Sequence, residues 1–118
     1  MTEARKTLGA QAETLAANLL KNKGYRILGR NLTFSIGEID ILAQEGDTMV
    51  LVEVKAKTSN RFGTAAEMVH AHKQHKLWQL AEIVRMRFPQ KSVRIDVVAV
   101  DYSITPPKLE HILNAVTR

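Results

Sequence analysis

Two patterned segments, residues 36–44 and 48–57, constrain the fold more than any other part of this chain. Both are rich in apolar residues, many of them β-branched, and charged residues alternate with apolar ones away from the loop between them, which is typical of strands. Gly46 and Asp47 lie between them, and a two-residue loop with glycine at its first central position joins antiparallel strands. The sequence therefore predicts a β-hairpin with a fixed register.

The predicted register brings acidic residues together at the open end of the hairpin. One face is expected to be wholly apolar, with Ile39, Ile41, Ala43, Val50, Val52 and Val54. On the other face, Asp40 is expected opposite Glu53, and Glu38 opposite Lys55. Opposed carboxylates destabilise a sheet, because their Cβ atoms lie only about 4.5–5.5 Å apart. A compensating positive charge is therefore expected at this end.

Two kinds of compensation are open at this point. A divalent cation can bridge Asp40 and Glu53, and Mg²⁺ suits such a pair because it binds one or two carboxylates and keeps waters or phosphate oxygens. Alternatively, Glu38 pairs with Lys55 while Asp40 points into water, which is an ordinary solvated arrangement of charges. The sheet context favours a cleft, because an α/β sheet is normally covered on both faces.

The remaining segments predict helices and strands around this hairpin. Apolar residues recur at three- and four-residue steps before Gly24 and before Pro89, which is typical of amphipathic helices that end there. The expected elements are a helix over 4–23, a strand over 25–34, a helix over 65–88, a strand over 92–100 and a short final strand or turn over 109–112. Together they predict one α/β domain over residues 1–118, with the order α-β-β-β-α-β.

Composition narrows the classes of function. The 118 residues include 17 Lys and Arg against 12 Asp and Glu, and the formal charge of +5 favours a polyanionic partner. The chain has no cysteine, which excludes disulfides and a thiol nucleophile and suits a reducing cytoplasm. No apolar run approaches the roughly 20 residues of a membrane-spanning helix, so a cytoplasmic location is expected.

Several motifs, taken in order, resemble a known family. Asp40, followed after twelve residues by Glu53-Val54-Lys55, resembles the Asp…Glu-x-Lys core of the restriction-endonuclease-like PD-(D/E)xK nucleases. A wider set resembles the bacterial YraN-type family, whose members are similar to archaeal Holliday junction resolvases: Gly9…Glu13, Gly24-Tyr25, Arg30-Asn31, Gly37-Glu38-Ile39-Asp40, Glu53-Val54-Lys55, Phe62-Gly63 and Arg94-Ile95-Asp96-Val97. Lys57 departs from this pattern, since an arginine is more usual there.

The resemblance implies a fold, a site and an activity. The fold is an α-β-β-β-α-β core whose mixed sheet is flanked by helices. In the superfamily an aspartate and a glutamate hold the metal ion and a lysine lies beside the attacking water, roles that fall here to Asp40, Glu53 and Lys55. A glutamate on the first helix joins the site in the resolvase-like branch, and Glu13 matches it. The implied activity is Mg²⁺- or Mn²⁺-dependent hydrolysis of DNA, with branched or junction DNA as the implied substrate.

Basic residues around this set are candidates for phosphate contacts: Arg30, Lys57, Arg61, Lys73 and Lys76. Such side chains position a duplex without reading its sequence. A homodimer is expected, because enzymes that cut both strands of a junction are commonly symmetric. Two other interpretations stay open: a nucleic-acid-binding module of the nuclease fold with little or no activity, and a structural partner protein without affinity for nucleic acid.

Two further features are interpreted as structural. His70, His72 and His75 do not share one helix face, and no fourth ligand is evident, so a basic helix start is favoured over a zinc site. Asp96 lies in the middle of a predicted strand, where an ion pair that stabilises the fold is favoured over a catalytic role.

Overall fold

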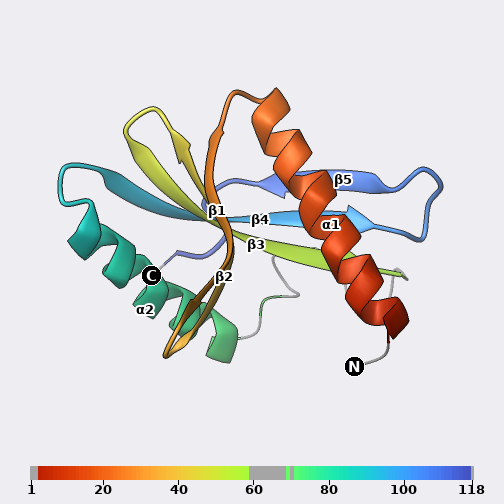
Figure 1. Ribbon diagram of the computed structural model, residues 1–118, viewed down its shortest axis with the longest axis horizontal. Coiled ribbons are helices and arrows are strands. Elements are labelled where there is room, and N and C mark those ends of the chain that lie inside the picture. Colours follow the sequence, from red (N-terminus) through yellow and green to blue (C-terminus); the bar gives the residue numbers. More distant parts are fainter. Residues whose placement is uncertain (1–2, 59–68, 70, 118) are drawn as a thin grey trace.

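The structure is a computed structural model, and it describes residues 3–58, 69 and 71–117. Within these residues the elements are α1 (Glu3–Asn22), β1 (Arg26–Phe34), β2 (Gly37–Glu45), β3 (Thr48–Lys57), α2 (Ala71–Arg87), β4 (Ser92–Asp101) and β5 (Lys108–Ile112) (Figure 1). They form a five-stranded sheet in the order β1-β2-β3-β4-β5. β3 and β4 are parallel, and the other neighbours are antiparallel.

The predicted α/β class, the order α-β-β-β-α-β and the mixed sheet flanked by helices are confirmed. The short segment predicted over 109–112 is a strand that pairs with β4. The helix predicted over 65–88 corresponds to α2, and residues 65–68 and 70 lie outside the described residues. Over the described part of the chain, neither helix combines the length and the apolar character that crossing a membrane requires.

β2 and β3 form the predicted hairpin in the predicted register. Pairing runs from Glu45 and Thr48, next to the turn, to Ile41 and Val52. Gly46 has a φ of 56°, a conformation that glycine adopts without the steric cost of a Cβ atom. Its carbonyl oxygen accepts a hydrogen bond of 2.9 Å from the side-chain amide of Gln44. The turn therefore fixes which residues of the two strands face each other.

The sheet buries apolar residues on both faces, and each face has its own helix (Figure 1). Against α1 lie Ile41, Ala43, Val50, Val52, Val98 and Val100, which pack on Ala12, Ala16, Ala17 and Leu20. Against α2 lie Leu42, Met49, Leu51, Ile95, Val97 and Ala99, which pack on Leu77, Leu80, Ala81 and Val84. Successive residues of β3 and β4 are consequently apolar, as in any sheet covered on both sides.

The predicted faces of the hairpin are wrong at its open end. Strict alternation predicts Ile39 beside Ile41, but Ile39 packs in the cluster against α2, together with Leu42. Ile41 belongs to the cluster against α1. Ile39 and Leu42 are therefore consecutive residues on the α2 side, although two residues separate them instead of one. The strict alternation of β2 breaks next to Asp40.

The expected pairs of Asp40 with Glu53 and of Glu38 with Lys55 are also not formed, because the β2–β3 ladder ends at Ile41 and Val52. Beyond that pair, β2 remains joined to β1 as far as Gly37, and β3 remains joined to β4 as far as Lys57. Each strand follows its other neighbour, so the hairpin opens. This opening between β2 and β3 is termed the fork below.

Candidate active site

Asp40 is the first residue of β2 past the last hairpin pair, and its side chain spans the fork. Asp40 Oδ2 accepts a hydrogen bond of 2.9 Å from the backbone N–H of Val54 on β3. A carboxylate thus replaces the main-chain acceptor that a continued ladder would supply. This bond holds the Asp40 side chain between the two separating strands.

Three carboxylates meet on the α1 side of the fork. Glu13 on α1 and Glu38 and Asp40 on β2 each place one oxygen so that the three atoms lie within 4.8 Å of one another. Burial and the negative charge of Asp40 raise the pKa of Glu13, against a partial lowering by a hydrogen bond from Asn31 and by the charge of Arg30. These carboxylates therefore repel one another in a partly desolvated place.

Glu53 lies on the α2 side of the fork and is only 4% exposed. Lys55 Nζ is 3.8 Å from Glu53 Oε1, and Lys73 Nζ is 3.7 Å from Glu53 Oε2. Glu53 Oε2 is buried and has no hydrogen-bond partner among the described residues. Burial and then the charge of Asp40 raise the pKa of Glu53 to about 7, although both lysines lower it in part.

Asp40 connects the two sides electrostatically. Burial raises its pKa, and Glu38 adds to this rise, whereas the Val54 N–H, Lys73 and Lys55 act against it. The set Glu13, Glu38, Asp40, Glu53, Lys55 and Lys73 is termed the fork site. It holds four carboxylates against two lysine ammonium groups.

The fork site fits a hard divalent cation. Mg²⁺ and Mn²⁺ prefer carboxylate oxygens, and Glu53 Oε2 is a buried carboxylate oxygen that no described group hydrogen-bonds. Burial raises the pKa of both Asp40 and Glu53, and the charge of Glu38 raises that of Asp40 further, as the charge of Asp40 does for Glu53. A bound cation would relieve this repulsion between carboxylates. Asp40 and Glu53 are the residues that would hold it, with Glu13 next to Asp40.

The residues predicted to contact phosphates are distributed unevenly. Arg30 Nη2 lies 3.8 Å from Glu13 Oε1, and Lys73 reaches Glu53, so both belong to the surroundings of the fork site. Lys57 instead pairs with Asp101, at 3.8 Å between Nζ and Oδ2. Lys76 lies on α2, three residues after Lys73. Arg61 and His70 lie outside the described residues, as does the side chain of His72, so the preference for a basic helix start over a zinc site stays a prediction.

Two features of the site do not follow from the sequence reasoning. The predicted register places Glu38 on the face of Asp40 but pairs it with Lys55, whereas the structure groups it with Glu13 and Asp40. Lys73 is predicted to contact phosphates alone, and no sequence signal marks it as a neighbour of Glu53. Its place depends on how α2 packs on the sheet.

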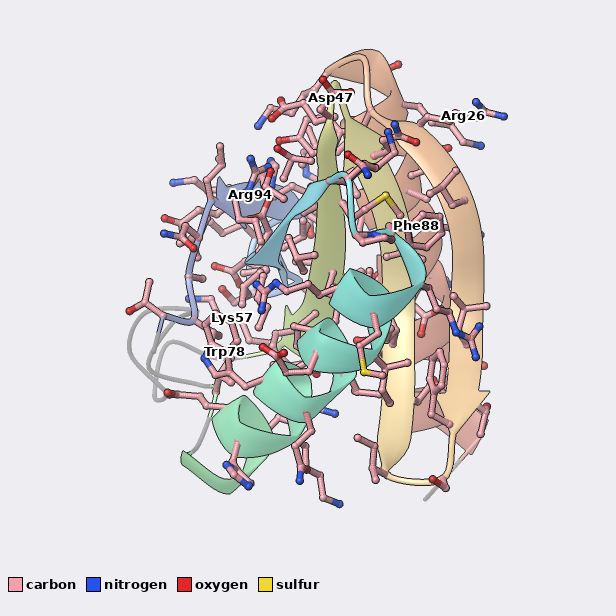
Figure 2. All side chains as sticks on the ribbon, turned by 90° about the vertical axis from the view of Figure 1, so that its left-hand side faces the viewer. Arg26, Asp47, Lys57, Trp78, Phe88 and Arg94 are labelled. Carbon is pink, nitrogen blue, oxygen red and sulfur yellow. The ribbon has the colours of Figure 1, made fainter. Side chains whose placement is uncertain are left out.

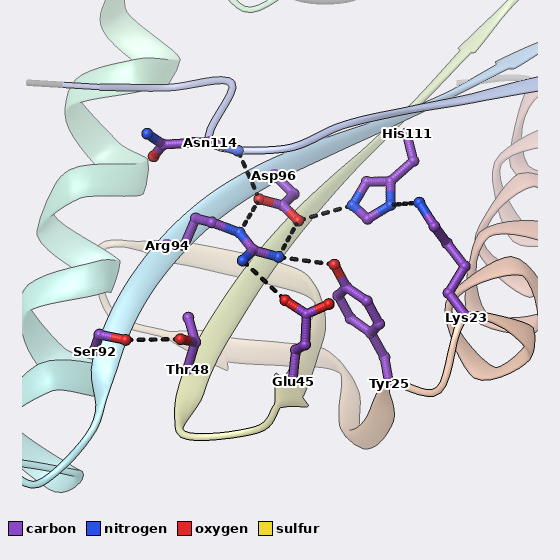
Figure 3. Close-up of polar contacts among 9 residues, drawn as sticks. All are labelled: Lys23, Tyr25, Glu45, Thr48, Ser92, Arg94, Asp96, His111 and Asn114. Carbon is purple, nitrogen blue, oxygen red and sulfur yellow. Dashed lines mark hydrogen bonds and ion pairs between the residues drawn. The ribbon is translucent and has the colours of Figure 1, made fainter.

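A second cluster of polar groups surrounds Asp96, whose exposed fraction is 0% (Figure 3). Its carboxylate accepts hydrogen bonds from Arg94 Nε and Nη2 at 2.8 and 3.0 Å, from the Asn114 N–H at 2.9 Å and from His111 Nε2 at 2.8 Å. Lys23 Nζ donates to His111 Nδ1 at 2.7 Å, because an ammonium group cannot accept. Arg94, Asp96, His111 and Asn114 are termed the Asp96 hub.

The hub stabilises the ionised form of Asp96. Burial raises the pKa of this carboxyl, but the hydrogen bonds from His111, Arg94 and Asn114 outweigh burial, so the pKa is lowered. The ion pair predicted for Asp96 is therefore present. Figure 2 shows Arg94 toward the hairpin turn at Asp47 and Lys57 toward the other end of β3. Asp96 lies beside Val52, and Glu53 lies beside Val97, in the register of β3 and β4. The two carboxylates point to opposite faces of the sheet, because Val52 packs in the cluster against α1 and Val97 in the cluster against α2.

The fold and the fork site define a mixed α/β domain in which carboxylates and lysines gather where two strands part. Residues 12–100 match the family described as "Uncharacterised protein family UPF0102", and the chain belongs to this family. The resemblance to the YraN-type family is thereby confirmed, and the assignment to the PD-(D/E)xK nucleases stays a prediction.

Similar proteins occur in distant bacteria. A UPF0102 protein of Caldanaerobacter subterraneus subsp. tengcongensis is 41% identical, over 94% of this chain and 95% of its own length. A UPF0102 protein of Pseudomonas aeruginosa is 38% identical, over 96% of this chain and 94% of its own length. Among solved structures, a chain of an EndoMS–dsDNA2 complex matches with a TM-score of 0.48 and 22% identity. That match covers 74% of this chain and 34% of the other.

Proposed function

We propose that this protein is a divalent-metal-dependent nuclease of the PD-(D/E)xK type, which hydrolyses phosphodiester bonds in DNA. The observation that carries the proposal is the fork site. Asp40, Glu53 and Lys55 gather there, and Glu53 Oε2 is buried without a hydrogen-bond partner among the described residues. A buried carboxylate left in this state costs stability, so its presence supports a functional role.

The proposed mechanism assigns a task to each side chain. When bound, a divalent cation would neutralise charge on the phosphate and lower the pKa of a water that it coordinates. Asp40 and Glu53 would hold this cation from the two separating strands. Lys55 stands beside Glu53 on β3 and would donate to a non-bridging phosphate oxygen, where negative charge develops in the transition state. Glu13 would orient the attacking water by accepting a hydrogen bond from it.

The substrate is proposed to be branched or junction DNA, on the resemblance to junction resolvases. Two copies of the chain would then act as a homodimer, so that two related sites meet two related strands. Arg30 and Lys73, which border the fork site, would hold the phosphate backbone on either side of the bond that is cut.

Cleavage assays with matched variants test the proposal. Labelled duplex, single-stranded, flap and four-way-junction DNA would be incubated with Mg²⁺, Mn²⁺ or EDTA. Asp40→Asn and Lys55→Met should each lower the cleavage rate by at least about 100-fold, because each removes a group that acts on the transition state. Asp47→Asn and Lys91→Met are the controls, since both residues lie at the hairpin-turn end of the sheet and their ion pair is solvent-exposed.

Binding measured with Ca²⁺ in the same samples separates catalysis from affinity. Retained binding without cleavage in the two fork-site variants would support the assignment. If wild type and both variants bind every substrate equally and cleave none in any metal, the nuclease proposal is contradicted and a nucleic-acid-binding module is favoured.

A further inference from the structure

Glu53 is flanked by two lysines that come from different elements. Lys55 is two residues further along β3, and Lys73 is the third residue of α2. Their ammonium nitrogens lie 3.8 Å from Oε1 and 3.7 Å from Oε2, respectively. In the part of the chain that the structure describes, these are the only cationic groups within 4.0 Å of Glu53. Together they place two positive charges beside a buried carboxylate.

The two lysines differ in how firmly they are held. Lys55 projects from a strand that is paired with β4 along its length, so its backbone is fixed. Lys73 reaches Glu53 from the beginning of a helix, and its side chain is 36% exposed, against 30% for that of Lys55. A lysine stem can keep its apolar contacts while the ammonium group turns into water. Lys73 can therefore leave Glu53 by a change of rotamer.

The approach of Lys73 to Glu53 is an ion pair rather than a hydrogen bond. Glu53 Oε2, the oxygen nearest to Lys73, has no hydrogen-bond partner among the described residues. Lys73 also lowers the pKa of Asp40, so its charge acts on both carboxylates that would hold a cation. Lys73 thus acts on both carboxylates through its positive charge, and it donates no hydrogen bond to Glu53 Oε2.

We propose that Lys73 substitutes for the divalent cation in the metal-free protein and turns outward to bind a substrate phosphate once the cation is held. This inference rests on the proposed nuclease function and adds a regulatory step to it. A divalent cation and an ammonium group beside one carboxylate repel each other, so Lys73 leaves Glu53 when the metal site fills. The freed ammonium group remains at the edge of the fork site, where phosphates would lie.

The proposal requires that cation binding and phosphate binding favour each other. If Lys73 binds a phosphate only when the cation is held, linkage requires that the phosphate strengthens cation binding by the same factor. DNA would then bind poorly before the site is loaded, and better afterwards. Lys73 is a positioning and binding residue in this scheme, whereas Lys55 stays beside Glu53 throughout.

Cation affinity in the absence of DNA is the first test. Mn²⁺ titrations would compare wild type with Lys73→Met, and the variant should bind Mn²⁺ about fivefold to tenfold more tightly because the competing charge is gone. Lys76→Met changes the same charge on the same helix and is the control, with an expected change below about twofold. Unchanged or weaker Mn²⁺ binding by Lys73→Met would overturn the proposal.

DNA affinity with and without a cation is the second test. In EDTA, wild type and Lys73→Met should bind junction DNA equally. With Ca²⁺, wild type should bind more tightly, and its log–log salt dependence should be steeper by about 0.9, the value for one additional phosphate neutralised. Lys73→Arg, which keeps the charge, should behave like wild type. A loss of affinity in Lys73→Met that is equal in EDTA and Ca²⁺ would mean an ordinary phosphate contact and would overturn the proposal.

The two tests distinguish this inference from the proposed function. If wild type binds no Mn²⁺, both are wrong. If wild type binds Mn²⁺ and cleaves DNA while Lys73→Met matches it in both titrations, the nuclease proposal stands and the exchange of Lys73 for a cation is wrong.

Discussion

The Asp96 hub and the fork site both bury carboxylates against one sheet, but they compensate the burial differently. Asp96 is fully buried and accepts four hydrogen bonds from groups of the chain itself. Glu53 is almost as buried, yet its nearest cations stand at 3.7 and 3.8 Å and one of its oxygens has no hydrogen-bond partner among the described residues. The pKa of Asp96 is lowered, whereas that of Glu53 is raised to about 7.

This difference separates a stabilising cluster from one that suits the proposed function. Burial disfavours the charged form of both carboxyls, so the donors around each group decide the sign of the pKa shift. In the hub, the chain supplies every donor. At the fork site, the chain leaves negative charge for a partner from outside to neutralise, which is the state that a binding or catalytic site requires. Variants of Asp96 and of Glu53 should therefore change stability in opposite directions.

The largest effect is expected from Asp96→Ala. The substitution removes the acceptor of Arg94 and His111 and leaves a half-buried guanidinium without its main partner. We expect the free energy of unfolding in urea to fall by about 3–5 kcal/mol. Asp47→Ala is the control, because the Asp47 side chain is 97% exposed, and it should change stability by less than about 0.5 kcal/mol. A loss below about 1 kcal/mol for Asp96→Ala would mean that the hub does not stabilise the fold.

The contrast also explains what the sequence could and could not predict. The hairpin register follows from local chemistry, since Gly46 favours the turn and the alternation of β2 and β3 specifies which residues pair. The motif of Asp40, Glu53 and Lys55 indicated that one site would contain all three. The register and this motif both depend on residues that lie close together in the sequence.

The fork itself could not be predicted in this way. The ladder ends at Ile41 and Val52 because β2 follows β1 and β3 follows β4, and these pairings are long-range. Strict alternation therefore places Ile39 on the wrong face. The position of Lys73 depends similarly on the docking of α2, which has no local signature. The missed parts are those set by tertiary packing rather than by hairpin chemistry.

Acidification should also lower the free energy of unfolding, by protonating Asp96, and by less than Asp96→Ala does. The folded pKa of Asp96 is lowered below its unfolded value, so the stability that it contributes is fully present above the unfolded pKa. That contribution is lost as pH falls through the folded pKa, because the native state must then accept a proton that it disfavours. Unfolding free energies from about pH 6 to about pH 2 should fall more in wild type than in Asp96→Asn. Parallel curves would contradict a stabilising role for the ionised carboxylate.

The smallest effect, and the one of opposite sign, is expected from Glu53→Gln. At about pH 8 the wild-type carboxylate is mostly ionised in a place where burial and Asp40 disfavour its charge, whereas a glutamine carries none. We therefore expect the free energy of unfolding in EDTA to rise by about 1 kcal/mol. Glu110→Gln, on the exposed part of β5, is the control and should change this free energy by less than about 0.5 kcal/mol.

Added Mg²⁺ should stabilise wild type and not Glu53→Gln, because a ligand stabilises only a protein that binds it. A loss of more than about 1 kcal/mol in Glu53→Gln would place Glu53 with Asp96, as a carboxylate that the fold needs.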